Sequence, residues 1–246
     1  MSNGNFLQNI PPVTKNLLII NTLLMLIMAL MPSFGNSLID RLGLHYVASD
    51  LFNPAQIFTY MFLHGGWTHL IFNMFTLWMF GRIMEQVWGP RRFFVYYMVC
   101  GIGAAFCQEA VWALTWKHDY IEGIARLNGL SFENMKQVVD AALAAGDTQW
   151  VSAVEKTKCM MVTIGASGAI FGILLGFAFV FPNMPLYLFF IPVPIKAKYM
   201  VLGYAVIELL LGVNGGGTIA HFAHLGGMLF GLVLLLYWRG RGTLHG

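Results

Sequence analysis

Long runs of hydrophobic residues alternate with short polar segments along most of the chain. A helix that spans a membrane needs about 20 mostly apolar residues, and six segments approach or reach that length. Turn signals rich in Gly, Pro and Asn separate several of them, such as MPSFGN, WGPRR and FPNMP. The pattern predicts an all-α polytopic membrane protein built as a six-helix transmembrane bundle. The predicted spans, numbered one to six in chain order, are residues 16–31, 67–86, 93–116, 167–181, 197–213 and 220–238.

One long interruption, residues 117–158, carries most of the acidic residues. Within it, apolar residues recur at helical spacing, Ser131 can cap a helix start and Gly146 can end it. We expect a short amphipathic helix that packs on the protein or the membrane surface, a simpler interpretation than a specific binding site. The chain is expected to form a single membrane domain over residues 1–246, with 117–158 as an extramembrane insertion. The recurring apolar residues are Met135, Val138, Val139, Ala142 and Leu143.

Composition strengthens the membrane assignment. Hydrophobic residues make up 58% of the 246 residues and charged residues only 10%, whereas roughly a quarter of a soluble domain is charged. The net charge of +3 comes from only 14 Lys and Arg, so it does not indicate binding to nucleic acid. The three cysteines match no zinc or redox spacing, and no metal or cofactor is expected. The first residues lack a basic start and no small-residue cleavage site follows the first span, so a removable signal peptide is not expected.

Basic residues near the span ends predict the orientation, because Lys and Arg there favour the cytoplasm. With the N-terminus inside, the short outer segments hold only Arg41. We therefore expect a multi-pass protein of the cell membrane with both termini cytoplasmic. The inner basic residues are Lys15, Arg82, Arg91, Arg92, Lys196, Lys198, Arg239 and Arg241.

Polar residues of unusual type gather at one depth of the predicted bundle. Ionisable groups inside a membrane are costly, so a cluster of them is a functional hypothesis. Spans two, four and six all run inward from the outer face, and each carries such residues near its beginning. The sequence therefore predicts a polar site near the outer face. Its members are His64, His69 and Asn73, then Ser167, then His221 and His224.

Glycines predict which of these groups meet. They recur every four residues in spans four and six, a spacing that lets two membrane helices approach closely. Close approach would bring Ser167 to His224, whose neutral imidazole can take the hydroxyl proton and activate the oxygen as a nucleophile. His221, one turn earlier, is interpreted as an interfacial residue. The glycines are Gly168, Gly172 and Gly176 in span four, and Gly227 and Gly231 in span six.

No acidic residue is predicted to orient this base. Glu85 lies near the inner end of span two, Glu109 toward the outer end of span three, and Glu208 toward the inner half of span five. The economical interpretation is a dyad of serine and histidine. His69 and Asn73, four residues apart on one helix face, would then donate hydrogen bonds to the oxyanion formed when the serine attacks an amide. The backbone N–H of the serine would join them.

With these residues in view, the sequence closely resembles the rhomboid family of intramembrane serine proteases. The strings HGGWTHLIFN, GASGAIFG and AHLGGMLFG carry the resemblance, which covers roughly residues 16–116 and 159–238. It implies hydrolysis of a peptide bond in or next to the transmembrane segment of another membrane protein, in a lipid bilayer.

The resemblance also assigns roles to single residues. It implies that Ser167 is the nucleophile, His224 the general base, and His69 and Asn73 the oxyanion site. Phe171 sits where the family often has an aromatic ring, in many members a tyrosine, stacked on the catalytic imidazole. Supporting positions are His64, Gly165, Gly168 and Gly227. Two features depart from the family pattern: Arg41 lacks the preceding Trp of many bacterial members, and the 117–158 insertion is long.

Two other classes remain as alternatives. An inactive rhomboid-like protein would bind membrane clients without cutting them, although Ser167 and His224 are both present. A metal-dependent membrane protease or a metal transporter would use histidines, but the HExxH string of helical zinc proteases is absent. The histidines open to that use are His64, His69, His221 and His224. We also expect span five and the glycine-rich segment 213–218 to move when a substrate enters.

Overall fold

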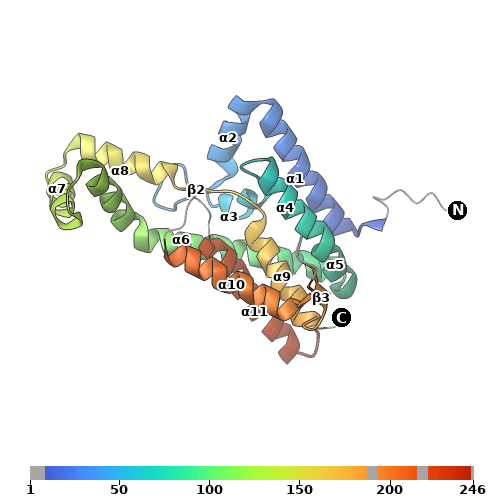
Figure 1. The fold of residues 1–246 in the computed structure, drawn as a ribbon. Coiled ribbons are helices and arrows are strands. Elements are labelled where there is room, and N and C mark those ends of the chain that lie inside the picture. Colours follow the sequence, from blue (N-terminus) through green and yellow to red (C-terminus); the bar gives the residue numbers. More distant parts are fainter. Residues whose placement is uncertain (1–8, 188–192, 215–220, 245–246) are drawn as a thin grey trace.

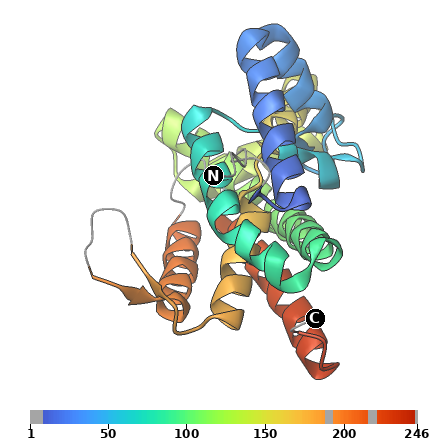
Figure 2. The ribbon, with the colours of Figure 1, turned by 90° about the vertical axis from the view of Figure 1, so that its right-hand side faces the viewer.

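The computed structural model describes residues 9–187, 193–214 and 221–244. This part of the chain is mostly helical, with four two-residue strands, which confirms the predicted all-α class. Three helices, α6, α9 and α11, pack against one another at the centre, and α10 lies at one edge of the bundle, away from α1 (Figures 1 and 2). Their bounds are α1 Pro12–Leu30, α6 Pro90–Asn128, α9 Ser167–Val180, α10 Ala197–Val213 and α11 His221–Gly240.

All six predicted spans fall on helices. Span two consists of three joined pieces: α4 (Trp67–Thr76), a π-helical turn η3 (Leu77–Gly81) and α5 (Arg82–Trp88). Among the described helices, α1, α6 and α11 are long and apolar enough to cross a membrane, and α9 is a shorter apolar helix. The membrane fold agrees with the sequence prediction, while the number of spans stays a prediction.

The segment after span one contains a helix that the sequence analysis missed. The predicted turn MPSFGN is a break at Met31 followed at once by α2 (Pro32–Leu42), a short helix with a polar face. The connection onward includes two short helical turns and a strand that pairs antiparallel with the segment just before Ser167. This pairing joins the first loop to the polar site. The elements are β1 Leu44–His45, α3 Gln56–Thr59, η2 Tyr60–Phe62 and β2 Val162–Thr163; a second hairpin pairs β3 Pro185–Leu186 with β4 Ile195–Lys196.

The predicted insertion contains more helix than the single amphipathic helix that was expected. The 39 residues of α6 extend over about 58 Å, twice the roughly 30 Å of a bilayer core, so α6 continues well past its predicted end at residue 116. Then follow α7 (Phe132–Ala144), which is the expected helix, and α8 (Thr148–Met160), which was not expected. Together they form an arm that projects from the bundle (Figure 1).

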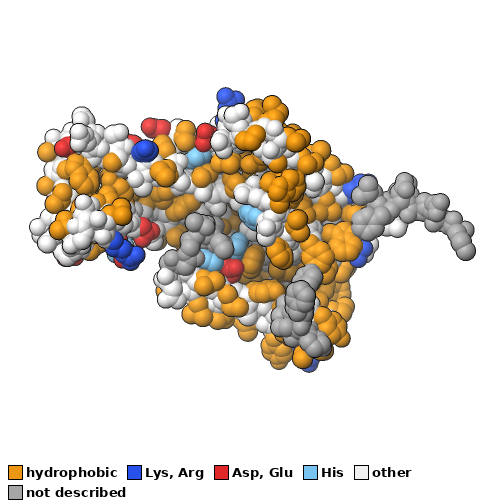
Figure 3. Space-filling view, turned by 45° about the horizontal axis from the view of Figure 1, so that its top comes forward, with side chains coloured by type: hydrophobic (Ala, Val, Ile, Leu, Met, Phe, Trp, Pro, Cys, Tyr) orange, Lys and Arg blue, Asp and Glu red, His pale blue; other side chains and the backbone are white. Residues whose placement is uncertain are grey.

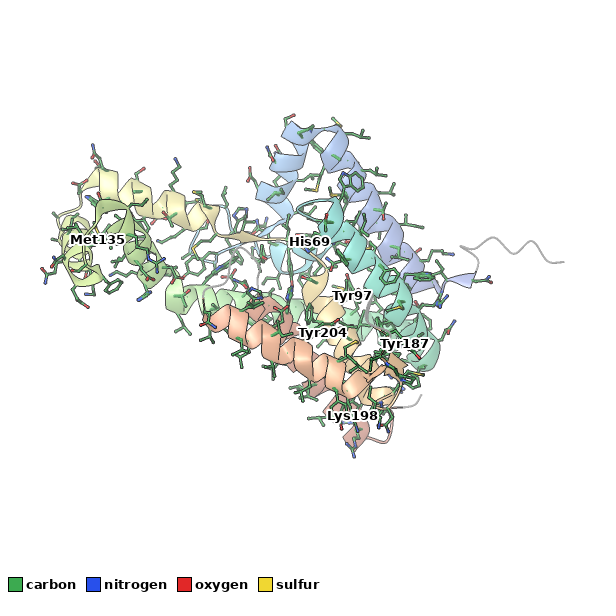
Figure 4. All side chains as sticks on the ribbon, viewed as in Figure 1. His69, Tyr97, Met135, Tyr187, Lys198 and Tyr204 are labelled. Carbon is green, nitrogen blue, oxygen red and sulfur yellow. The ribbon has the colours of Figure 1, made fainter. Side chains whose placement is uncertain are left out.

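The capping residues of α7 are those predicted. The backbone N–H of Asn134 donates to Ser131 Oγ at 3.3 Å, and Gly146 follows the helix with a φ of +68°. The prediction of the apolar face of α7 was partly wrong, because Val138 is 46% exposed. Met135 and Val139 instead close a small core with α6 (Figure 4, where Met135 is labelled).

An ion pair fastens α7 to α6. Lys117 of α6 lies 2.8 Å from Asp140 of α7, and Lys136 lies 2.9 Å from the other oxygen of the same carboxylate. Lys117 first, and then Lys136, hold the pKa of the Asp140 carboxyl below its usual value. The pairs are exposed, so they help to fix the arm's geometry and contribute little stability.

Glycines bring α9 and α11 into contact, as their spacing predicted. A Cβ added to Gly227 of α11 would overlap the backbone carbonyl group of Gly168 of α9. A Cβ added to Gly172 would overlap the side chain of Cys100 of α6, and the Tyr96 hydroxyl donates to the Gly172 carbonyl at 2.8 Å. The first turns of α9 and α11 are therefore held side by side.

A buried carboxylate joins α1 to α5. Glu85 is 2% exposed, and its two oxygens accept hydrogen bonds from the backbone N–H groups of Val13 at 2.9 Å and Thr14 at 2.7 Å. These N–H groups are unpaired at the start of any helix, where a negative charge is also favourable. Glu85 thus serves a structural role and lies outside the polar site.

Candidate active site

Two residues from neighbouring helices meet where α9 and α11 begin. Ser167 is the first residue of α9, and His224 lies in the first turn of α11. The Oγ atom of Ser167 is 2.8 Å from Nε2 of His224, a hydrogen-bond distance. His224 is only 8% exposed, whereas Ser167 is partly accessible. A hydroxyl held against a neutral imidazole can pass its proton to the ring nitrogen as the oxygen attacks.

An aromatic stack fixes the plane of the His224 ring. Phe171, one turn after Ser167, lies parallel to it, with centroids 4.3 Å apart and planes within 6°. Tyr204 of α10, labelled in Figure 4, makes an edge contact with the Phe171 ring, and the two ring centroids are 6.4 Å apart. The stack lets the imidazole present Nε2 to Ser167 on one side and Nδ1 toward α10 on the other.

The two residues predicted to stabilise an oxyanion, His69 and Asn73, both lie in α4, and the supporting His64 lies in the segment before it. The Asn73 amide nitrogen lies 3.0 Å from His64 Nε2, and both residues are buried. The rings of His64 and His69 make an edge contact with centroids 5.0 Å apart. This amide has two hydrogens, and among the described residues it makes no hydrogen bond other than the one to His64. His64 therefore positions both Asn73 and His69.

A glycine makes room for His69 beside the serine. Gly165 has a φ of +137°, a conformation that residues with side chains rarely adopt. A Cβ there would lie 2.6 Å from Cε1 and 2.8 Å from Nε2 of His69, and 3.7 Å from the Ser167 Oγ. His69 and Ser167 thus flank the same point. The N–H of Gly165 donates to the Tyr60 carbonyl at 3.0 Å, which holds the segment in place.

These side chains line a cavity of about 780 Å³. Figure 3 shows histidine side chains in the middle of this face of the molecule, with an acidic side chain beside them. A volume of this order is typical of small-molecule sites. Most of the cavity wall is apolar, and the polar groups of His69, Asn73, Ser167 and His224 are set into it. The membrane face toward which it opens stays a prediction. Among its lining residues are His69, Asn73, Gly165, Ser167, Gly168, Phe171 and His224.

The prediction that no acidic residue reaches the base is wrong. Oε2 of Glu208 lies 3.0 Å from Nδ1 of His224 and 2.6 Å from Nδ1 of His221. The sequence prediction misjudged the depth of Glu208 in the helix bundle relative to His224. Glu208 lies five residues before the end of α10, and α10 packs against α11, so its side chain reaches the level of the first turn of α11.

His221 is not an interfacial residue as predicted. It is 5% exposed and hydrogen-bonded to Glu208, because the carboxylate lies between the two histidines of this turn. The sequence held one signal for this contact. Glu208 is an acidic residue within an apolar helix, and the next helix begins with two histidines three residues apart, His221 and His224. Residues 215–218 of the segment expected to move, and Ala220 at the predicted start of span six, lie outside the described residues.

A set of possible metal ligands occurs at this place. The ligand atoms of Glu208, His221 and His224 lie within 4.8 Å of one another, and carboxylate and imidazole are ligands that zinc accepts. The four histidines considered from the sequence do not form one set. His64 and His69 lie with Asn73, whereas His221 and His224 lie with Glu208.

Comparison with known proteins decides the family. The family model of the rhomboid domain matches the sequence over residues 52–123 and 133–241. This chain belongs to the rhomboid family. It is 24% identical over 207 residues to Rhomboid protein 1, mitochondrial, of Saccharomyces cerevisiae, a match that covers 78% of this chain and 59% of the relative. It is 25% identical over 202 residues to Rhomboid-like protein 11, chloroplastic, of Arabidopsis thaliana, covering 73% of this chain and 51% of that protein.

The rhomboid chain thus matches a little over half the length of these two curated relatives. Family membership makes it a membrane protein and supports intramembrane proteolysis as its general class of activity.

Proposed function

We propose that this rhomboid is a serine endopeptidase that cleaves other transmembrane proteins within or next to their membrane spans. Ser167 is the nucleophile and His224 the general base. The observation that carries the proposal is the 2.8 Å contact between Ser167 Oγ and His224 Nε2 at the wall of this cavity. The reaction needs only water as its second substrate, and no cofactor takes part.

The chemistry proceeds in two halves. As Ser167 Oγ bonds to the scissile carbonyl carbon, its proton passes to Nε2 of His224. The same nitrogen then returns the proton to the leaving amine as the C–N bond breaks, which leaves an acyl ester on the serine. In the second half His224 takes a proton from a water molecule as the water oxygen attacks the ester carbon. The C–O bond to Ser167 then breaks, His224 returns the proton to Oγ, and the carboxylic acid product leaves.

The negative oxygen of each tetrahedral intermediate needs hydrogen-bond donors. His69 and Asn73 line the cavity beside Ser167, and the backbone N–H of Ser167 lies at the start of α9, where helix N–H groups are unpaired. His64 and Gly165 support this site, the first by bonding the Asn73 amide and the second by leaving space for the His69 ring. Donors of this kind act most strongly in a site shielded from bulk water.

The proposed orientation rests on the charge distribution. The basic residues at the span ends support a multi-pass protein of the cell membrane with both termini cytoplasmic and the cavity toward the outer face. The two relatives carry the words mitochondrial and chloroplastic in their names, so the compartment needs its own test. Reporter fusions at the C-terminus, read on intact cells, give its side.

The decisive experiment uses a fluorophosphonate probe, which reacts with activated serines, followed by peptide mapping. We expect the label on Ser167 of the wild-type protein and none on the Ser167→Ala or His224→Ala variants. The same two variants should lose cleavage of a model transmembrane substrate while they keep the helical content of the wild type.

Cleavage retained by the Ser167→Ala variant would exclude Ser167 as the nucleophile. A wild-type protein that neither labels nor cleaves would favour an inactive rhomboid that binds membrane clients. Activity lost on treatment with a chelator would favour metal chemistry at Glu208, His221 and His224.

A further inference from the structure

We infer that Glu208 is a positioning residue for the base, so that the site works as a triad of serine, histidine and glutamate in place of a dyad. This inference rests on the proposed function, because it concerns how His224 is held for the same reaction. Among the described residues Glu208 has no hydrogen bond to Ser167, and it acts through the imidazole of His224.

The geometry of the two ring nitrogens carries the inference. Nε2 of His224 faces Ser167 at 2.8 Å, and Nδ1 on the opposite side of the ring lies 3.0 Å from Oε2 of Glu208. This Nδ1 is buried, and among the described residues it makes no well-aligned hydrogen bond. The carboxylate oxygen next to it is the group that can accept its proton, after a small rotation of the Glu208 side chain.

This contact selects the useful tautomer of the base. His224 can accept the serine proton only when Nε2 is bare and the ring proton is on Nδ1, and an acceptor at Nδ1 favours that form. Once Nε2 takes the proton, the ring becomes a cation that faces the carboxylate. Glu208 itself stays ionised throughout, and the Nδ1 proton stays on the ring.

His221 shares the same carboxylate oxygen, at 2.6 Å. An ionised carboxylate can accept several hydrogen bonds, so Glu208 can accept one from each of the two histidines. Glu208 is only 13% exposed at its side chain, although the neighbouring residues Ile207 and Leu209 are about half exposed. The carboxylate is therefore turned into the site while the rest of this helix turn faces outward.

The test compares three variants by the rate at which the fluorophosphonate probe labels Ser167. Glu208→Gln keeps the shape of the side chain and removes its charge. His221→Gln removes the other partner of the carboxylate. Glu109→Gln is the matched control: Glu109 is also a partly buried glutamate of an apolar helix, but its oxygen accepts from the backbone N–H of Val47 at 2.8 Å, away from the site.

We expect Glu208→Gln to be labelled at least tenfold more slowly than wild type; replacing the orienting carboxylate of a serine protease triad by its amide can lower kcat by about 10⁴-fold. Glu109→Gln should label at the wild-type rate. His221→Gln should lose much less than Glu208→Gln. With a fluorogenic transmembrane peptide, the fall in the Glu208→Gln variant should appear in kcat, with KM little changed.

The results distinguish the role of Glu208 from the assignment of the protein as a serine protease. A wild type labelled on Ser167 together with a Glu208→Gln variant labelled equally fast would overturn the role of Glu208 and leave the protease assignment intact. Equal losses in Glu208→Gln and His221→Gln, or a change in KM alone, would make Glu208 a structural partner of His221 and also overturn it. A wild type that does not label on Ser167 removes the proposed function and this inference with it.

Discussion

Replacing Gly227 by alanine tests whether glycine packing holds the catalytic pair together. The added Cβ would overlap the carbonyl carbon and oxygen of Gly168. Both atoms belong to the backbone of α9, so no side-chain rotation can relieve the overlap. The helices must separate, and the first turns of α9 and α11, which carry Ser167 and His224, must move with them.

The expected size follows from the contact. Nonbonded carbon atoms prefer separations of about 3.5–4.0 Å, so the helices must shift by about 1 Å or more at this point. Overpacking of this kind typically costs about 1–3 kcal/mol of stability. A misplacement of about 1 Å between reacting groups lowers rates by about 10²-fold. We therefore expect Gly227→Ala to fold with a lower Tm and to label with the fluorophosphonate probe about 100-fold more slowly.

The assay pairs the labelling rate with thermal unfolding of the purified protein. Gly203→Ala is the matched control, because Gly203 lies within α10 and a Cβ there would meet nothing within 4 Å. This control should keep both the wild-type rate and the wild-type Tm or a slightly higher one. A Gly227→Ala variant that labels like the wild type would show that close approach at this position does not set the geometry of Ser167 and His224.

Two further variants probe the walls of the site. Asn73→Ala should lower kcat by about 10²–10³-fold, equal to the roughly 2.7–4 kcal/mol typical of one oxyanion donor, without abolishing cleavage; an unchanged rate would remove Asn73 from the site. Phe171→Leu should slow labelling by about 2- to 10-fold, because stacked aromatic pairs contribute about 0.5–1.5 kcal/mol, whereas Phe171→Tyr should retain the wild-type rate. Equal rates in Phe171→Leu and wild type would mean that the ring does not hold His224.

The parts of the site that sequence could predict are those coded by local spacing. Glycines four residues apart mark one face of a helix. On α11 this face also carries His224, and on α9 Ser167 directly precedes the first of the glycines. His69 and Asn73 were likewise placed together by their spacing of one helix turn. These predictions need only the periodicity of a helix.

Glu208 was missed because its position depends on two helices at once. Its place within α10 was countable, but its depth relative to His224 depends on where α10 ends and how it packs on α11. Helix α2 and the last turns of α6 were missed for another reason. Both are polar enough that no apolar run marks them, and the α6 extension is held by contacts with α7 that come later in the chain.

The placement of Glu208 on α10 has a consequence for the order of events. The buried residues of α10 are Ala197, Met200 and Val201, all in its first two turns. Toward its other end the helix contacts the site through Tyr204 against Phe171 and through Glu208 against the two histidines. If α10 moves to admit a substrate segment, this end has the fewest packed side chains to hold it, and the carboxylate leaves His224 with it. The base would then be correctly oriented only after α10 returns, so substrate entry and bond cleavage would require different positions of one helix.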